Sequence, residues 1–238
     1  MYKYETHLHT AETSACASAK GAEQARRYKE EGYDGIFVTD HFFNSNTTVP
    51  RDMAWADKVE LYCKGFENAK AEGDRIGLKV FFGIEYTYQG ADILVYGLDK
   101  KWLLAHPDCD KDFFRFHDDA KAAGALLIHA HPFRQANYLN GKIVLLPEWV
   151  DGIEVYNSGN GEESWNRHAE WYADEFGFRK TAGSDNHHLW VASERLAGVF
   201  SEVEINSPAD YRDAFFADKI TPAYPAKKAD EYYSDPTI

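Results

Sequence analysis

The sequence predicts an α/β fold whose strands close, or nearly close, into a barrel. Apolar segments that end in ionisable residues alternate with helical segments along the chain. This alternation is typical of a parallel sheet covered by helices, and about seven such units favour a barrel over an open sheet. A length of 238 residues suits one large domain. We therefore expect one barrel domain over residues 1–238.

The helical segments have polar composition with apolar residues on one face. They cover residues 19–31, 53–72, 112–123, 163–176 and 208–218. Glycine follows or ends the first three, at Gly32, Gly73 and Gly124, and glycine commonly ends a helix. These segments supply the expected outer layer.

The strand segments are short apolar runs between the helices. After an opening run before His7, they cover residues 35–41, 78–85, 92–98, 125–131, 150–157, 180–187 and 196–202. Several end in histidine, aspartate or glutamate, whereas segment 92–98 begins with Asp92. In a parallel barrel the carboxyl ends of the strands meet at one mouth, where active sites are built.

Composition excludes several classes of protein. A net charge of −13 argues against a broad basic surface for duplex nucleic acid. The sequence has no apolar run of about 18 residues and no secretion signal, so we expect a soluble, cytoplasmic protein without a membrane partner. The three cysteines are scattered, and we expect free thiols, including Cys16 near the first histidines.

The stretch Glu5-Thr-His-Leu-His9 opens the candidate site. In an extended strand Glu5, His7 and His9 share one face, so the two imidazoles could hold a metal ion. A single His-x-His pattern is weak evidence, but the barrel would bring similar residues to the same mouth. The residues expected to converge are His7, His41, Glu85, His131 and Asp185.

These patterns resemble the polymerase and histidinol phosphatase (PHP) family of metal-dependent phosphoesterases. The matching residues span nearly the whole chain in the family's order: HLH at 7–9, TDH at 39–41, Glu85, AHP at 130–132 and GSDNH at 183–187. The resemblance implies a distorted seven-stranded, TIM-like (β/α)7 barrel. It also implies two to three divalent ions, zinc, manganese or iron.

The resemblance also assigns ligands. It implies that His7, His9 and Asp185 hold one ion, that Glu85 bridges it to a second ion held by His131, and that His41 and His187 hold a third. Two positions depart from the commonest family pattern. There we expect Glu12 to complete the third site and Asp92 the second. Oxygen ligands at both positions favour harder ions such as Mn²⁺ or Fe²⁺.

Further residues are expected around the ligands. Glu5 and Asp40 are predicted to orient ligand imidazoles, and His129 is predicted to support the site or the core rather than to bind metal. Arg134 follows the histidine at the barrel mouth and could grip a substrate phosphate, or pair with a surface carboxylate.

We expect a metal-dependent phosphoesterase that acts on a small phosphorylated metabolite or nucleotide. The nucleophile would be a metal-activated hydroxide, because clustered divalent ions neutralise a phosphate ester and acidify bound water. Two alternatives stay open: a metal-dependent hydrolase of a carbon–nitrogen bond, and a non-catalytic, regulatory metal-binding module. The sequence does not choose the substrate, the native metal or the oligomeric state.

Overall fold

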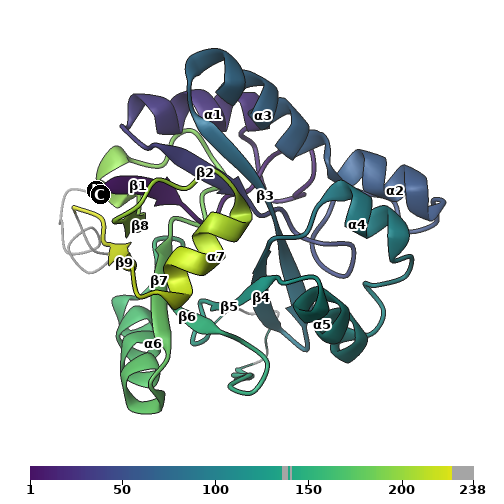
Figure 1. Ribbon diagram of the computed structural model, residues 1–238. Coiled ribbons are helices and arrows are strands. Elements are labelled where there is room, and N and C mark those ends of the chain that lie inside the picture. Colours follow the sequence, from purple (N-terminus) through teal and green to yellow (C-terminus); the bar gives the residue numbers. More distant parts are fainter. Residues whose placement is uncertain (136–138, 140, 227–238) are drawn as a thin grey trace.

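The computed structural model describes residues 1–135, 139 and 141–226, and its strands form one mixed sheet (Figure 1). The strands are β1 (Tyr2–Glu5), β2 (Gly35–Val38), β3 (Lys79–Tyr88), β4 (Ala91–Tyr96), β5 (Leu126–Ala130), β6 (Gly152–Asn157), β7 (Arg179–Gly183), β8 (Gly198–Ser201) and β9 (Ile220–Ala223). Their order in the sheet is β7-β6-β5-β4-β3-β2-β1-β8-β9.

The first seven strands form a nearly closed barrel. They follow one another in the sheet in chain order, and β1 and β7 approach each other at their carboxyl ends. There the Thr6 hydroxyl donates to Ala182 O at 2.8 Å, and the Asp185 amide donates to His7 O at 2.9 Å. The predicted α/β, TIM-like barrel is therefore confirmed, and its closure brings the two ends of the sequence together.

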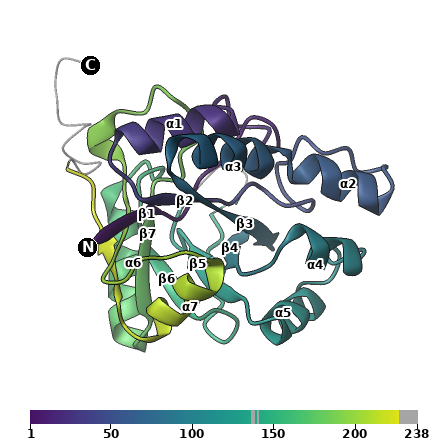
Figure 2. The ribbon, with the colours of Figure 1, turned by 45° about the horizontal axis from the view of Figure 1, so that its top comes forward.

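Helices cover the outside of the barrel. They are α1 (Gly21–Glu30), α2 (Trp55–Tyr62), α3 (Lys64–Ile76), α4 (Lys100–Ala105), α5 (Phe113–Ala122), α6 (Glu163–Phe176) and α7 (Pro208–Phe216), with a short 3₁₀ helix η2 (Ser193–Arg195). Helices α1 and α3 lie side by side (Figure 2). They approach so closely that a Cβ at Gly21 would lie 2.2 Å from Gly65 O, which requires glycine there.

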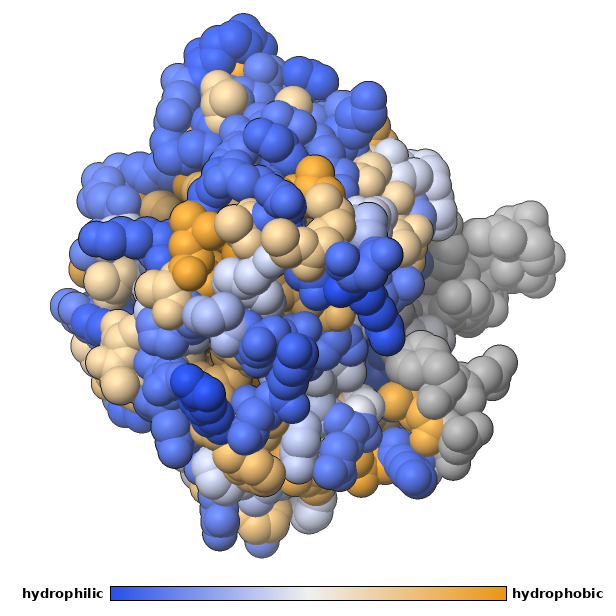
Figure 3. Space-filling view, turned by 90° about the vertical axis from the view of Figure 1, so that its right-hand side faces the viewer, coloured by the Kyte–Doolittle hydropathy of each residue, from blue (hydrophilic) through white to orange (hydrophobic). Residues whose placement is uncertain are grey.

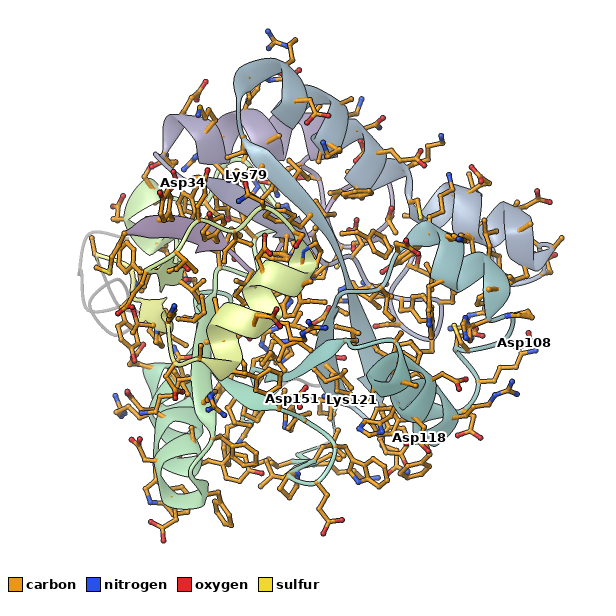
Figure 4. The ribbon with its side chains drawn as sticks, in the orientation of Figure 1. Asp34, Lys79, Asp108, Asp118, Lys121 and Asp151 are labelled. Carbon is orange, nitrogen blue, oxygen red and sulfur yellow. The ribbon has the colours of Figure 1, made fainter. Side chains whose placement is uncertain are left out.

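Helix α7 covers the amino end of the barrel, as Figure 1 shows. Its Tyr211 and Phe215 are buried with Tyr4, Phe37 and other strand residues in one apolar cluster. Burial of each such aromatic side chain contributes about 1.5–3 kcal/mol. At this end Lys121 Nζ pairs with Asp151 Oδ1 at 2.7 Å, and Figure 4 shows the two residues near each other. The opposite, carboxyl end of the barrel is therefore where a functional site is expected.

The sheet is not parallel throughout. Strand β4 is antiparallel to both β3 and β5, and β8 is antiparallel to β1 and β9. The connection from β3 to β4 consists of Gln89 and Gly90, both with positive φ. Two residues allow a hairpin but no helical crossover, so β4 must run antiparallel. The antiparallel direction of β4 also explains why Asp92, at the start of this strand, lies at the same end of the barrel as the carboxyl ends of the parallel strands.

Segment 53–72 was predicted to form one helix that ends at Gly73, and this prediction is wrong. The structure has two helices that meet at Cys63, and α3 continues to Ile76. Gly77, with φ 73°, ends it. Gly73 is buried instead, where a Cβ would lie 2.5 Å from Val80 Cγ2, so this glycine permits close packing on β3. The sequence patterns also missed α4 and β9.

The face that carries α2, α4 and α5 is mostly hydrophilic, with hydrophobic residues in small areas (Figure 3). Such scattered apolar residues are normal on a protein surface. In the described part of the chain, no helix combines the length and apolar character needed to span a bilayer.

Candidate metal centre

A cluster of histidines and carboxylates occupies the carboxyl end of the barrel. Its residues follow β1, β2, β5 and β7 or lie within β3. They are His7, His9, His41, Glu85, His131, Asp185 and His187. The structure therefore brings together, from distant parts of the sequence, the residues that the family resemblance assigned to metal ions.

Glu85 lies at the centre of this cluster, and it is 1% exposed. Its Oε1 is 3.1 Å from His7 Nε2 and 3.3 Å from His131 Nε2. Its Oε2 is 2.6 Å from His41 Nδ1 and 3.4 Å from His9 Nε2. Each carboxylate oxygen thus faces two imidazoles, which is the arrangement a ligand needs to bridge neighbouring cations.

Buried atoms without hydrogen bonds indicate that the cluster suits cations. Within the described residues, His7 Nε2, His9 Nε2, His41 Nδ1 and Glu85 Oε2 have no hydrogen-bond partner although they are buried. Buried polar atoms are normally hydrogen-bonded, so unpaired atoms that converge are an exception with a cause. Imidazole nitrogens and carboxylate oxygens together fit zinc, iron or manganese.

The possible ligand atoms form three overlapping groups, in each of which the atoms lie within 4.8 Å of one another. The groups are His7, His9 and Asp185; His7, Glu85 and His131; and His9, His41 and His187. His7 and His9 each belong to two groups. Because an imidazole nitrogen has one lone pair, each of them can serve only one ion through the same atom.

Hydrogen bonds fix which nitrogen of each histidine faces the centre. His7 Nδ1 lies 2.9 Å from Glu154 Oε1, and His9 Nδ1 lies 3.0 Å from Ser14 Oγ. His187 Nδ1 lies 2.8 Å from the backbone oxygen of Asp185. In all three residues Nε2 is left to bind a cation, and such partners are known to orient metal ligands.

Sequence reasoning missed Glu154 and Ser14. Glu154 is buried in β6, where its Oε2 also accepts hydrogen bonds from the His131 amide and from Asn157 Nδ2. An acidic residue inside the apolar run Gly-Ile-Glu-Val-Tyr was the available signal, because a buried carboxylate needs partners. Ser14 had no comparable signal.

Replacing Glu154 by glutamine is expected to weaken metal binding by about 10–100-fold. Either orientation of the new amide would direct its NH₂ group at a donor, the His7 ring or the His131 amide. Zinc affinity measured by competition with a chelating dye tests this. Glu163→Gln, a buried glutamate on α6 that accepts from Asn166, is the matched control and should bind zinc normally. Equal affinities in the two variants would contradict the role of Glu154.

Charge in the cluster shifts two pKa values in opposite directions. Burial opposes the ionised form of Glu85, but His41 and His7 outweigh it and hold the pKa of that carboxyl well below its usual range. Burial opposes protonation of His7, but Asp185, Glu154 and Glu85 outweigh it and raise its pKa well above the usual value. A cation that binds His7 Nε2 must displace a proton, so binding strengthens as the pH rises.

The predicted supporting residues act in different ways. Asp40 accepts from Ser14 Oγ at 2.6 Å, and Ser14 contacts the His9 ring, so Asp40 acts on a ligand through Ser14. Glu5 does not orient an imidazole: its Oε1 accepts from the amides of Thr6, His7 and Ser184. The carboxylate of Glu5 therefore holds the ends of β1 and β7 together, which corrects the prediction.

His129 is buried in β5. Among the residues that the structure describes, neither of its ring nitrogens has a hydrogen-bond partner. Burial and the neighbouring His131 lower the pKa of its imidazole to about 3, which keeps it neutral. His129 is thus a neutral core residue rather than a group that orients the ligands.

Glu12 corrects the prediction for the third ion. Its carboxylate accepts from the Gly21 amide at 3.0 Å and from Asn68 Nδ2 at 2.9 Å, so it caps the amino end of α1 outside the cluster. Asp92 does lie near the centre, with Oδ2 3.9 Å from His131 Nε2. The hairpin between β3 and β4 delivers Asp92 to this end.

Cys16, rather than Glu12, lines the same cavity as His41 and His187. Burial opposes ionisation of this thiol, but the influence of His187 and His41 outweighs it and lowers the pKa to about 6. Among the cysteines, Cys63 and Cys109 are buried elsewhere in the apolar core, whereas Cys16 is exposed.

Backbone strain coincides with the centre. His131 has φ 30° and Asp185 has φ 52°, a region that residues other than glycine rarely adopt. Each such residue costs of order 1–3 kcal/mol, and strain of this kind gathers at functional sites. His131 directly follows β5 and Asp185 lies two residues after β7, so both strained residues belong to the cluster.

The cluster forms one wall of a cavity of about 620 Å³. His41, Glu85, His131, Asp185 and His187 line it together with polar residues and two cations, Arg134 and Lys142. Arg134 is anchored, because its Nη2 lies 2.7 Å from Asp185 Oδ2 and its Nε donates to Asn160 Oδ1. Arg134 therefore orients a candidate ligand and faces the cavity as well.

Comparison with known proteins agrees with this fold. No family model matches the sequence. A two-domain protein from Bacteroides vulgatus, which contains a predicted PHP-like metal-dependent phosphoesterase, has a TM-score of 0.70 at 17% identity over 94% of this chain. This chain spans 65% of that protein. PsfC from Pseudomonas syringae has a TM-score of 0.62 at 16% identity, covering 98% of this chain and 96% of PsfC.

Two further similarities extend the comparison. An amidohydrolase from Chromobacterium violaceum, with bound sulfate and no metal, has a TM-score of 0.53 at 14% identity and covers 96% of this chain and 99% of its own. An uncharacterised protein of Methanocaldococcus jannaschii is 30% identical over 107 residues, which are 42% of this chain and 44% of that protein. The fold of this chain is therefore that of PHP-like proteins, as the sequence motifs predicted.

Proposed function

We propose that this protein is a metal-dependent hydrolase of the PHP type that cleaves the phosphate ester of a small metabolite or nucleotide. The observation that carries the proposal is the buried convergence of four imidazoles on the single carboxylate of Glu85, with Asp185 beside it. When bound there, divalent ions neutralise a phosphate ester and acidify a water molecule.

The residues would hold two or three ions. His7, His9 and Asp185 suit one, and Glu85, His131 and Asp92 suit a second. His41 and His187 suit a third. Hydrogen bonds that the ring nitrogens make to Glu154, Ser14 and the Asp185 backbone oxygen hold the imidazoles in place before any ion binds, which reduces the cost of ordering the ligands.

The cavity supports a small anionic substrate. A volume of about 620 Å³ falls in the range of pockets for small molecules and is a poor match for duplex nucleic acid. Arg134 and Lys142 line this cavity together with the candidate ligands. Their charge would attract a phosphate and position it against the metal centre, since guanidinium and ammonium groups both bind phosphate well.

A hydrolase of a carbon–nitrogen bond is the second candidate, favoured by the similarity to the amidohydrolase. The same ions would polarise a carbonyl group. The sulfate in that protein is a tetrahedral anion, so the likeness is also compatible with a phosphate-binding site. A regulatory module that binds metal without turnover is the third reading, and the open cavity beside the ligands speaks against it.

A substrate screen separates these candidates. The protein is loaded with zinc, manganese or iron and incubated with phosphorylated metabolites, including nucleotides and histidinol phosphate, and in parallel with amides and cyclic imides. We expect release of inorganic phosphate that a chelator abolishes and that Asp185→Asn loses. Turnover of amides alone would favour the second candidate, and stoichiometric metal without turnover of either panel would favour the module.

A further inference from the structure

The side chain of Arg134 lies between the metal cluster and a group of buried asparagines. Its guanidinium contacts three oxygens: Nη2 lies 2.7 Å from Asp185 Oδ2 and donates to Asn157 Oδ1 at 2.7 Å, and Nε donates to Asn160 Oδ1 at 2.9 Å. The side chain is 16% exposed, and it lines the cavity together with His131 and Asp185. Because a guanidinium is a rigid plane, contacts at both Nε and Nη2 fix its orientation at the cavity wall.

Three asparagines form a buried, hydrogen-bonded chain beside this arginine. Asn157 ends β6, Asn160 lies in the connection from β6 to α6, and Asn166 lies in α6. Asn160 Nδ2 donates to Asn166 Oδ1 at 2.7 Å, and the same Asn166 oxygen accepts from the Asn157 amide at 3.0 Å. The three residues are at most 3% exposed. A buried polar network whose members pair with one another is rigid, so it can hold Arg134 in one orientation.

The backbone of Gly159 lies against the same guanidinium. A Cβ at this residue would be 3.0 Å from each of three atoms, Arg134 Nη2, Asn157 Oδ1 and Asp185 Oδ2. The Gly159 amide also donates to Asn157 Oδ1 at 2.8 Å, which identifies this oxygen as the acceptor that faces Arg134. The connection that follows β6 is therefore built closely around one guanidinium.

The partners of the guanidinium differ in charge. Of the three oxygens, only that of Asp185 is charged, and its carboxylate is shared: Oδ1 faces His7 Nε2 at 3.4 Å and His9 Nε2 at 3.2 Å. The other two are amide oxygens, which accept hydrogen bonds without cancelling the charge of an arginine. The asparagines thus fix the position of Arg134 and leave positive charge at the cavity wall for an anion.

We propose that Asn160 is a positioning residue, which holds Arg134 so that the guanidinium binds the phosphate group of the substrate. This inference rests on the proposed function and deepens it. Asn157 contributes as well, but its Nδ2 also donates to Glu154 Oε2 at 2.8 Å, close to the ligand imidazoles. Among the described residues, the side chain of Asn160 makes its hydrogen bonds with Arg134 and Asn166. Replacing Asn160 therefore changes the anion site without touching a candidate metal ligand.

Binding of inorganic phosphate tests the role of Asn160 without turnover. Protein loaded with zinc and freed of excess metal is dialysed to equilibrium against radiolabelled phosphate. We expect Asn160→Ala to bind phosphate about 10-fold more weakly than the wild type, since hydrogen bonds to charged groups are at the strong end of the range. Its zinc affinity should not change. Asn206→Ala is the matched control: Asn206 Oδ1 accepts from Lys79 Nζ at 2.7 Å, and Lys79 begins β3 at the amino end of the barrel. It should bind phosphate and zinc as the wild type does.

A double-mutant cycle tests whether Asn160 acts through Arg134. Arg134→Gln is expected to weaken phosphate binding at least as much as Asn160→Ala does. In the Arg134→Gln background, Asn160→Ala should change phosphate affinity by less than about twofold, because the group that it positions is gone. A general loss of packing would instead weaken binding by the same factor in both backgrounds.

Arg134→Lys gives an answer even if Asn160→Ala does not fold. Lysine keeps the positive charge, but its single ammonium group cannot reproduce the flat, two-point contact with the two amide oxygens. We expect about 10-fold weaker phosphate binding in this variant. Wild-type affinity in Arg134→Lys would show that charge alone suffices, and it would overturn the proposal.

The outcomes distinguish this inference from the proposed function. Wild-type phosphate affinity in Asn160→Ala, or equal losses in both backgrounds of the cycle, overturns the positioning role and leaves the phosphoesterase proposal standing. A fall in zinc affinity that matches the fall in phosphate affinity also overturns it, because the effect would then lie at the metal centre. Failure of the zinc-loaded wild type to bind phosphate overturns both.

Discussion

Replacing Glu85 by glutamine is expected to abolish binding of at least one ion and to lower turnover by at least about 100-fold. Residues that only orient ligands commonly contribute 10–100-fold, so a bridging ligand should reach or exceed the upper end of that range. Glutamine preserves the shape of the side chain but removes the negative charge that faces His7, His9, His41 and His131. The NH₂ group of the new glutamine would also face one of the cation positions and prevent a cation from binding there.

Elemental analysis of the purified variant and phosphate release measured at saturating metal test this prediction. Glu12→Gln makes the same chemical change at a carboxylate that caps α1 outside the cluster. It should keep full metal content and turnover and lose at most about 1 kcal/mol of stability. An equal effect of both substitutions would show that Glu85 has no special place in the centre.

The second large effect is expected from Gly183→Ala, at the end of β7. A Cβ at this position would lie 2.5 Å from His7 Cβ and 2.7 Å from Glu154 Oε1. The strands β1 and β7 would have to separate, and such overpacking costs about 1–3 kcal/mol. Because Asp185 follows two residues later, the same movement would draw its carboxylate away from His7 and His9 and weaken metal binding.

Urea denaturation of the metal-free protein and zinc affinity measure the two consequences separately. Gly161→Ala is the matched control: among the described residues the atom nearest to its Cβ would belong to Trp165, at 3.9 Å, and its stability should change by no more than about 0.5 kcal/mol. Wild-type stability and zinc affinity in Gly183→Ala would mean that the contact between β1 and β7 does not hold the centre together.

The sequence was informative about ligands because parallel strands place their carboxyl ends together. His7, His41, Glu85, His131 and Asp185 each follow or end an apolar run, so one rule of topology predicted their convergence. This rule does not apply to residues in irregular loops. Glu12 and Cys16 are four residues apart, and only the turn tied to Asn46 and His187 decides which of them faces the site.

Local sequence patterns also do not predict which contacts a buried residue makes. Gly73 reads as the end of a helix but serves close packing on β3, and Glu5 reads as a partner of imidazoles but binds backbone amides. In both cases a contact with a distant segment decides the role of the residue: β3 for Gly73 and the end of β7 for Glu5.

The amino-acid sequence predicted the class of fold and the residue types gathered at the barrel mouth, since alternation and strand-end residues are local properties. The tertiary structure shows which atoms of those residues face one another. Glu154 and Ser14 each occupy one nitrogen of a histidine, leaving a single nitrogen for metal. The closure of β1 on β7 then sets Asp185 beside His7 and His9.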